Sequence, residues 1–270
     1  MKIITLIDNY VKDRYLKAEH GLSYLIDDGI NKVLFDTGQS GAFIDNARRL
    51  NIDISDVSSL VISHGHYDHT GGLLEFCRIN NKAKIYIKEA AFNYKCRLVD
   101  DKPMYIGIEQ NFNIFNDRIV FIENDYQLTE NIYIVADIPL KDNAGVVSDK
   151  MVIIDDKGQI INDDFIDEQF IVIDYAGALA VITGCAHRGI FNIIDAAKAK
   201  FDKPISHVLG GFHFSNMNNC DAEILVKKFA SYQISNIGVG HCTGLEKFRL
   251  FSAVPDSNVF YNKTGYVITI

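Results

Sequence analysis

The stretch Ser59-Leu60-Val61-Ile62-Ser63-His64-Gly65-His66-Tyr67-Asp68-His69 decides the fold. Its first half is apolar and β-branched and predicts a buried strand, and its second half places imidazoles and a carboxylate on the loop that follows. Burying such a cluster carries a large desolvation cost, which a bound divalent cation offsets. We therefore predict a metal site here. The alternative is a surface loop that happens to be rich in histidine.

The spacing within this loop predicts two metal ions rather than one. His64 and His66 alternate along an extended backbone, so both can reach the same ion. Asp68 and His69 point in a different direction and can reach a second ion about 3.5–4 Å away, which is the separation found in two-metal hydrolases.

The pattern His64-x-His66-x-Asp68-His69 after a β-branched strand resembles the signature of the metallo-β-lactamase superfamily. The resemblance implies an α/β (α+β) fold, namely a four-layer αββα sandwich of two mixed β-sheets, with the metal site at one edge between the sheets. Asp36-Thr37-Gly38 is similar to the first motif of that superfamily, whose aspartate orients the ligating histidines. The alternative is that Asp36 is an ordinary turn residue at a strand end.

Length and composition limit the kind of protein this is. The 270 residues suffice for one large domain or two smaller ones, and we predict a single domain over residues 1–270. The formal charge is −8 without a run of Lys or Arg, which argues against a nucleic-acid partner. The odd number of cysteines, five, without a framework spacing is typical of reduced thiols in the cytoplasm. The longest apolar stretch, 175–186, is too short for a membrane span.

The remaining chain predicts alternating strands and helices around the loop. Strands are expected at 3–8, 22–27 and 32–36, as an antiparallel meander, and at 170–174 and 178–183, as a hairpin. Helices are expected at 41–50, 89–95 and 221–232. Residues 140–168 are polar and rich in aspartate, and an insertion of this length is uncommon unless it is a lid or binding loop. We predict a lid-like insertion at about 140–168 that covers a small-molecule substrate. The alternative is a solvated excursion without ligand contacts.

Histidine follows an apolar strand at three further places, His187, His213 and His241, each beside glycines that let the backbone approach closely. One such histidine is easily a core residue, but three in a chain that already carries the loop predict further metal or substrate contacts. Gly240-His241-Cys242-Thr243-Gly244 resembles the superfamily's final metal motif. This implies that His241 joins Asp68 and His69 at the second ion, and His187 is the predicted third ligand of the first.

The sequence allows two roles for Cys185 and two for His213. The strand before Cys185 resembles one that ends in Thr-Gly-Asp in many superfamily hydrolases, where the aspartate bridges both metals. A thiolate is a good zinc ligand, so Cys185 is either a metal ligand or a small packed residue beside the site. His213 is a candidate to protonate a leaving group or to donate to an oxyanion or a phosphate oxygen. Its alternative is a core histidine that is hydrogen-bonded to a carbonyl group.

The motifs around Cys185, His213 and His241, together with Asp167-Glu168-Gln169, resemble a narrower branch of the superfamily. This branch is named for 7,8-dihydropterin-6-yl-methyl-4-(β-D-ribofuranosyl)aminobenzene 5′-phosphate synthase. Its Gly-Glu-Ile-Pro-Arg pattern stands here as Ala136-Asp137-Ile138-Pro139-Leu140, so an arginine that could pair with a phosphate is missing.

The predicted function is metal-dependent hydrolysis of a small ester-type substrate, and a phosphoester is the preferred substrate class. Two divalent ions, zinc before manganese or iron, would lower the pKa of a water molecule, and the resulting metal-bound hydroxide would attack while Asp68 orients it. Two alternatives stay open, an iron-dependent thiol oxygenase on the same fold and a non-catalytic sensor of a small ligand. His66 favours hydrolysis over the reduction of dioxygen or nitric oxide, because iron-based redox members of the superfamily typically carry glutamate there, but it counts less against the thiol oxygenase. The oligomeric state cannot be read from the sequence.

Overall fold

The computed structural model describes residues 1–109, 117–141 and 150–270. The chain divides into two compact units, each with its own sheet. Unit 1 is formed by Met1–Glu123, Ser148–Glu168 and Lys263–Ile270, and unit 2 by Asn124–Val147 and Gln169–Asn262. No helix within the described ranges is long and apolar enough to cross a membrane.

Unit 1 contains a mixed seven-stranded sheet. Its first half is an antiparallel meander joined to the C-terminal strand, and from β3 onward the strands run parallel. The predicted meander at 3–8, 22–27 and 32–36 is confirmed. In sheet order the strands are β18 (Val267–Thr269), β1 (Lys2–Ile7), β2 (Ser23–Asp27), β3 (Lys32–Phe35), β4 (Ser59–Val61), β5 (Lys84–Ile87) and β8 (Ile119–Phe121).

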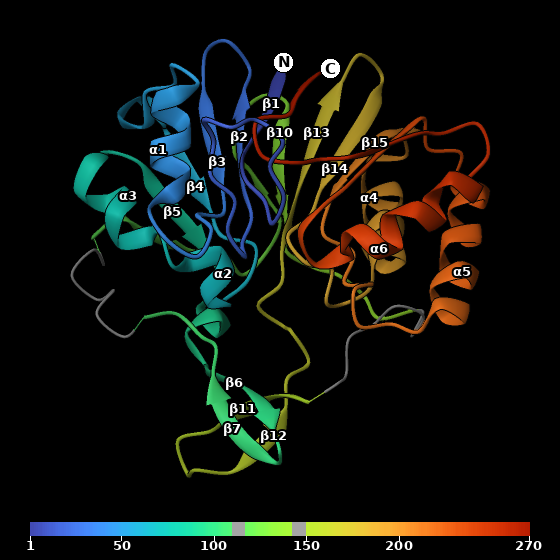
Figure 1. Ribbon diagram of the computed structural model, residues 1–270. Coiled ribbons are helices and arrows are strands. Elements are labelled where there is room, and N and C mark those ends of the chain that lie inside the picture. Colours follow the sequence, from blue (N-terminus) through green and yellow to red (C-terminus); the bar gives the residue numbers. More distant parts are fainter. Residues whose placement is uncertain (110–116, 142–149) are drawn as a thin grey trace. The chain divides into compact units, whose positions relative to one another are not determined.

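Two helices cover one face of this sheet, α1 (Ala42–Arg49) and α3 (Leu73–Ile79) (Figure 1). Their apolar side chains, such as Phe43 and Phe76, pack with Leu34, Leu60 and other strand residues into one core. The predicted helix at 41–50 is confirmed. Between β4 and α3 lie the histidine loop and the short helix α2 (Tyr67–Thr70). The unit also contains the 3-10 turns η1 (Ile54–Asp56) and η2 (Glu89–Phe92).

A separate four-stranded antiparallel sheet in unit 1 joins two distant segments. Its strands are β12 (Ile160–Asn162), β11 (Met151–Ile154), β6 (Tyr94–Val99) and β7 (Lys102–Tyr105). The prediction of a helix at 89–95 is wrong, because helical structure ends with η2 and Tyr94 already pairs with Ile154. Glu89-Ala90-Ala91 do form a helical turn, but pairing of Tyr94 and Lys95 with a strand far along the chain prevents the helix from continuing.

The predicted lid contributes two of these strands, β11 and β12. Residues 142–149 of the predicted lid lie outside the described residues. Of its acidic residues, Asp163 and Asp167 are buried rather than solvated. Whether this insertion covers a substrate stays a prediction.

Unit 2 is also built on a mixed seven-stranded sheet, here with its parallel half formed by the four strands from β14 to β17. The predicted hairpin at 170–183 is confirmed as β13 and β14. The strands in sheet order are β17 (Asn258–Tyr261), β16 (Asn236–Val239), β15 (Ile205–Gly210), β14 (Ala178–Ile182), β13 (Phe170–Tyr175), β10 (Ile132–Val135) and β9 (Tyr126–Gln127).

The helices of unit 2 pack with its sheet into a second core. They are α4 (Ile190–Phe201), α5 (Asn219–Lys228) and α6 (Leu245–Phe248), with the 3-10 turns η4 (Phe229–Tyr232), η5 (His241–Thr243) and η6 (Arg249–Ala253). Phe191, Phe212 and Phe229 stack at the centre of this core. The predicted helix at 221–232 is confirmed as α5 continued by η4.

Candidate metal centre

The histidine loop of unit 1 starts where two parallel strands end side by side. Asp36 follows β3 and Ser63 follows β4, and these strands pair in parallel. Asp36 adopts a left-handed conformation (φ 60°), which aspartate tolerates better than most residues. This turn aims its buried carboxylate at the neighbouring loop, where Ser63 donates its backbone N–H to Oδ1 at 2.7 Å and its hydroxyl to Oδ2 at 2.7 Å.

The carboxylate of Asp36 also fixes the tautomers of two loop histidines. It lies 2.6 Å from Nδ1 of His69, and because a carboxylate can only accept, this nitrogen carries the proton and Nε2 keeps its lone pair. The Ser63 hydroxyl uses its only hydrogen to donate a hydrogen bond to Asp36, so in its 2.9 Å contact with Nδ1 of His64 it is the acceptor. Both imidazoles thus carry their proton on Nδ1 and their lone pair on Nε2, the nitrogen that can ligate, which is the arrangement that carboxylates impose on metal-bound histidines.

His64 and His66 converge with the geometry of a chelating pair. Nε2 of His64 lies 3.1 Å from Nδ1 of His66. Two zinc–nitrogen bonds of about 2.0–2.1 Å at a tetrahedral angle place their nitrogens about 3.3–3.4 Å apart. The observed separation is therefore close to that of two ligands on one ion.

Asp68 and His69 lie on the short helix α2, at the next positions of the loop. Oδ2 of Asp68 lies 3.8 Å from Nε2 of His69 and 3.2 Å from Nε2 of His20. The contact with His20 is not visible in the sequence pattern, because His20 stands alone in a polar segment far from the motif. The side chain of His20 is half exposed.

Burial keeps the first two imidazoles neutral. It lowers the pKa of His66 to about 3 and that of His64 well below its ordinary value, and it outweighs the attraction of Asp68. A neutral imidazole is the form that binds metals, because its lone pair is not blocked by a proton. The donor set of the loop, three imidazoles and a carboxylate, therefore fits a zinc-type divalent ion.

The metal-free protein is expected to become less stable as the pH is lowered, because of His66. Its pKa is depressed on folding, so above about pH 6.5 it is neutral in both states and has no effect. Below that value only the unfolded chain takes up the proton, and stability decreases by about 1.4 kcal/mol per pH unit down to about pH 3. Denaturant unfolding of the chelator-treated protein at pH 4–7 measures this slope. It should be shallower by about one proton in His66→Gln, and equal slopes would contradict the assignment.

A buried ion network holds the loop from the other side. Gly65 donates its N–H to Oδ2 of Asp167 at 2.7 Å, and a Cβ at Gly65 would lie 2.0 Å from the carbonyl oxygen of Ala91, so only glycine fits. The other oxygen of Asp167 accepts from the ammonium group of Lys95 at 2.8 Å, and Asp163 accepts from the same group at 2.7 Å.

Burial and charge act in opposite directions on the pKa values of this network. Burial acts to lower the pKa of Lys95, but the two carboxylates outweigh it and the pKa is raised. Burial raises the pKa of Asp163 despite the attraction of Lys95. The ammonium group therefore stays charged, and its charge is what makes two buried carboxylates tolerable.

Unit 2 gathers its own candidate residues at the carboxyl ends of β14, β15 and β16. Backbone hydrogen bonds join the loops that follow these strands, from Gly211 to Gly184 at 2.9 Å and from Gly240 to Gly210 at 3.0 Å. His213 and His241 both have left-handed φ angles, 57° and 48°. Strained backbone of this kind is concentrated at functional sites. The side chains brought together in unit 2 are those of Cys185, His187, His213, His241 and Cys242.

Cys242 also belongs to this cluster. It lies within the 240–244 motif, but the sequence did not identify it as a site residue. Burial acts to raise the pKa of its thiol, but interactions with Cys185 and His213 outweigh burial, and the pKa lies well below its ordinary value. The ring centroids of His187 and His213 are 4.6 Å apart. Neighbouring thiols and imidazoles form a donor set that favours soft metals.

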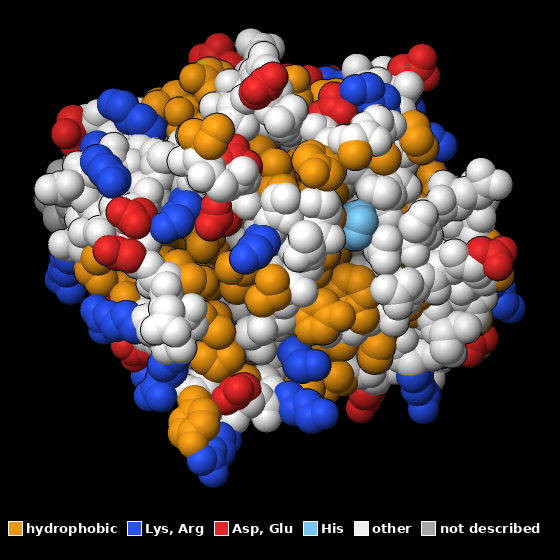
Figure 2. Space-filling model, turned by 90° about the horizontal axis from the view of Figure 1, so that it is seen from above, with side chains coloured by type: hydrophobic (Ala, Val, Ile, Leu, Met, Phe, Trp, Pro, Cys, Tyr) orange, Lys and Arg blue, Asp and Glu red, His pale blue; other side chains and the backbone are white. Residues whose placement is uncertain are grey.

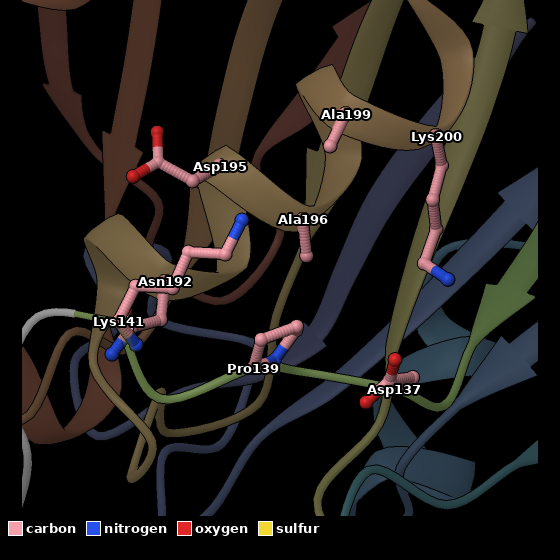
Figure 3. Close-up of a pocket in the computed structure, with 8 residues that line it drawn as sticks. All are labelled: Asp137, Pro139, Lys141, Asn192, Asp195, Ala196, Ala199 and Lys200. Carbon is pink, nitrogen blue, oxygen red and sulfur yellow. Dashed lines mark hydrogen bonds between the residues drawn. The ribbon is translucent and has the colours of Figure 1, made fainter.

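A pocket of about 190 Å³ on unit 2 includes the segment where the branch's arginine is missing. Figure 3 shows Asp137 and Pro139 running past α4, which carries Asp195 and Lys200. Two carboxylates and two ammonium groups line it, so the pocket offers no excess positive charge to a phosphate. On the face shown in Figure 2, lysine and arginine are scattered among other side chains.

Comparison with known proteins identifies the family. The family model described as the metallo-beta-lactamase superfamily matches residues 16–187, which include the histidine loop. The chain belongs to the metallo-β-lactamase superfamily. A solved metal-dependent hydrolase of this superfamily shares 31% identity at a TM-score of 0.86, over 100% of this chain and 99% of the other. The chain therefore has the metallo-β-lactamase fold, as the resemblance implied.

Two proteins of Methanocaldococcus jannaschii are similar over nearly the whole length. One is named 7,8-dihydropterin-6-methyl-4-(beta-D-ribofuranosyl)-aminobenzene-5'-phosphate synthase and is 26% identical, over 93% of this chain and 90% of the relative. The other is uncharacterised and is 29% identical, over 98% of both chains. The resemblance to the narrower branch of the superfamily is thereby confirmed.

Proposed function

We propose that this superfamily member is a metal-dependent hydrolase of a small ester-type substrate, most favourably a phosphoester. The observation that carries the proposal is the histidine loop of unit 1. Its imidazoles are buried, and burial keeps those of His64 and His66 neutral. Asp36 holds His69 directly, and His64 through Ser63, in the ligating tautomer. A loop with only a packing role has no need of three oriented imidazoles whose burial must be compensated.

The proposed ligands are the residues of the strand-end motifs. His64, His66 and His187 hold one divalent ion, and Asp68, His69 and His241 hold the other, with zinc preferred over manganese or iron. This set follows from the donor chemistry of the motifs and from the family. The sequence leaves Cys185 open as a further ligand of the same ions.

The residues of the loop prepare the site for hydrolysis. A pair of divalent ions supplies an activated water molecule and stabilises negative charge that develops on the substrate. Asp68 orients the attacking water, and Asp36 keeps His69 and Ser63 in place through its hydrogen bonds. Burial of His64 and His66 excludes bulk water from this side of the site.

A small phosphoester is the favoured substrate class. Divalent ions neutralise the charge of a phosphate group, so a pocket with excess lysine or arginine is not needed. One relative is named as the synthase of a compound that is a 5'-phosphate, which is consistent with a phosphorylated small molecule. A cytoplasmic location, a covering role for 150–168 and the absence of nucleic-acid and membrane partners stay predictions.

Metal content tests the proposal. Protein purified without added metal is expected to contain about two zinc or manganese ions per chain by inductively coupled plasma mass spectrometry. His187→Ala and His241→Ala should each retain about one. His207→Ala is the matched control, because His207 lies in β15 with its ring against Ser206 rather than in a strand-end loop, and it should retain both ions.

Activity is then screened with small phosphomonoesters and phosphodiesters. Turnover that is lost in both ligand variants and kept in His207→Ala would support the hydrolase. A single iron ion that is kept in His241→Ala, together with oxygen uptake in the presence of thiols, would replace it with the thiol oxygenase. Ligand binding without turnover, unchanged in His66→Ala, would favour the sensor.

A further inference from the structure

Three side chains of unit 2 form a group that the hydrolase proposal does not use as a unit. The ligand atoms of Cys185, His213 and Cys242 all lie within 4.8 Å of one another. Two zinc–sulfur bonds of about 2.3 Å at a tetrahedral angle place the sulfurs about 3.8 Å apart. The three atoms therefore need to close by about 1 Å at most to share one ion.

The framework around these side chains is rigid. Each residue follows a different strand of the parallel half of the sheet, and Ser215 donates its backbone N–H to the carbonyl of Cys242 at 3.1 Å. A Cβ at Gly211 would lie 2.5 Å from Sγ of Cys242 and 2.8 Å from the carbonyl oxygen of Gly184. Glycine at this position lets the thiol lie directly against the backbone beside His213.

The chemistry of the group matches a soft cation. Cys185 and Cys242 are buried, and Nδ1 of His213 is buried without a hydrogen-bond partner within the described residues. Two thiolates and one neutral imidazole balance the charge of a divalent ion, so the complex is neutral and tolerates burial. Sulfur and imidazole donors select zinc-like ions over magnesium or calcium.

We propose that unit 2 binds one thiophilic divalent cation of the zinc type through Cys185, Cys242 and His213. On binding, each thiol releases one proton to solvent, and three protein ligands leave a fourth tetrahedral position for a water molecule. Cys185 then belongs to this site and does not bridge the ions of the histidine loop. His213 is a ligand rather than a proton donor. The proposal goes beyond the hydrolase function and does not depend on it.

Cobalt substitution tests the site. Reduced, metal-free protein titrated with Co²⁺ is expected to develop a thiolate-to-cobalt charge-transfer band in the near ultraviolet. The band should be lost in Cys242→Ser. It should stay in the double variant His64→Ala/His66→Ala, which lacks the chelating pair of the loop, and in Cys220→Ser, whose thiol is exposed on the same unit.

A second variant covers the case in which Cys242→Ser fails to fold. Gly211→Ala keeps all three ligands but places a methyl group against Sγ of Cys242, and it should weaken cobalt binding at least tenfold while circular dichroism stays unchanged. A folded Gly211→Ala protein with wild-type cobalt affinity would overturn the proposal.

The outcomes separate this site from the hydrolase. A band that survives in Cys242→Ser and disappears in Cys185→Ser would make Cys185 a ligand of the other ions and overturn the three-residue site. A wild-type protein that binds cobalt without the band, although its thiols are reduced, would overturn it as well. A band with the expected variant pattern in a protein without phosphoesterase activity would support this site and count against the hydrolase alone.

Discussion

Replacing Lys95 with methionine is expected to lower the free energy of unfolding by about 3–5 kcal/mol, because it leaves two buried carboxylates without their cation. The ammonium group lies 2.7 Å from Asp163 and 2.8 Å from Asp167, and all three side chains are at most 1% exposed. Methionine fills a similar volume, so the loss reports the charge rather than a cavity. Denaturant unfolding at pH 7 measures it.

The matched control for this prediction is Lys17→Met. Lys17 also pairs with an aspartate, Asp45 at 2.5 Å, but its side chain is 52% exposed. Solvent screens such a pair, so the loss should stay below about 1 kcal/mol. The pKa of Asp163 is raised by burial, so the penalty in Lys95→Met should shrink as the pH falls and this carboxylate takes up a proton. Similar losses in the two variants would show that the buried network is not what stabilises unit 1.

Asp36→Asn is expected to weaken zinc binding by about 10–100-fold, the usual effect of removing a carboxylate that orients metal-bound histidines. Asp36 accepts three hydrogen bonds, from the N–H and hydroxyl of Ser63 and from Nδ1 of His69. An amide has one oxygen and an NH₂ group, so at least one of these donors would face another donor. His69 then loses the bond that fixes its ligating tautomer. Competition against a chromophoric chelator measures the affinity.

Asp53→Asn serves as the comparison for the Asp36 variant. Asp53 lies in the same unit and also accepts a backbone N–H, from Ser55 at 2.9 Å, but in an exposed turn away from the loop. Its replacement should leave zinc affinity unchanged. If Asp36→Asn bound zinc within about twofold of the wild type, the role of Asp36 in orienting His69 would have to be abandoned.

The parts of the site that the sequence predicted are those encoded in short stretches. His64, His66, Asp68 and His69 occupy one loop, and a strand followed by a dense set of ligand side chains identifies it directly. The role of Asp36 was predictable because it too follows a strand in a recognisable motif. The structure adds the contacts through which Asp36 acts, namely its hydrogen bonds with Ser63 and His69.

Contacts over long separations were not predictable in the same way. Lys95 and Asp167 are 72 residues apart, and neither shows in its own segment that it has a buried partner of opposite charge. Asp167 lies in the polar stretch that was predicted to be a lid-like insertion, and its buried ion pair was not predicted because composition reports charge but not the position of a counter-ion. Cys242 lies 57 residues from Cys185, and only the parallel order of β14, β15 and β16 brings their loops together.

The bond between Gly65 and Asp167 connects the loop to the small sheet. Asp167 also accepts from Lys95 on β6, and the same ammonium group donates to Asp163, which directly follows β12, so the loop backbone is connected through Lys95 to both hairpins of that sheet. The loop cannot open without breaking contacts of the small sheet, and the two should therefore fluctuate as one cooperative unit in hydrogen exchange. Any ligand that binds the loop in its closed form then slows exchange in β6 and β11 as well, although it touches neither strand.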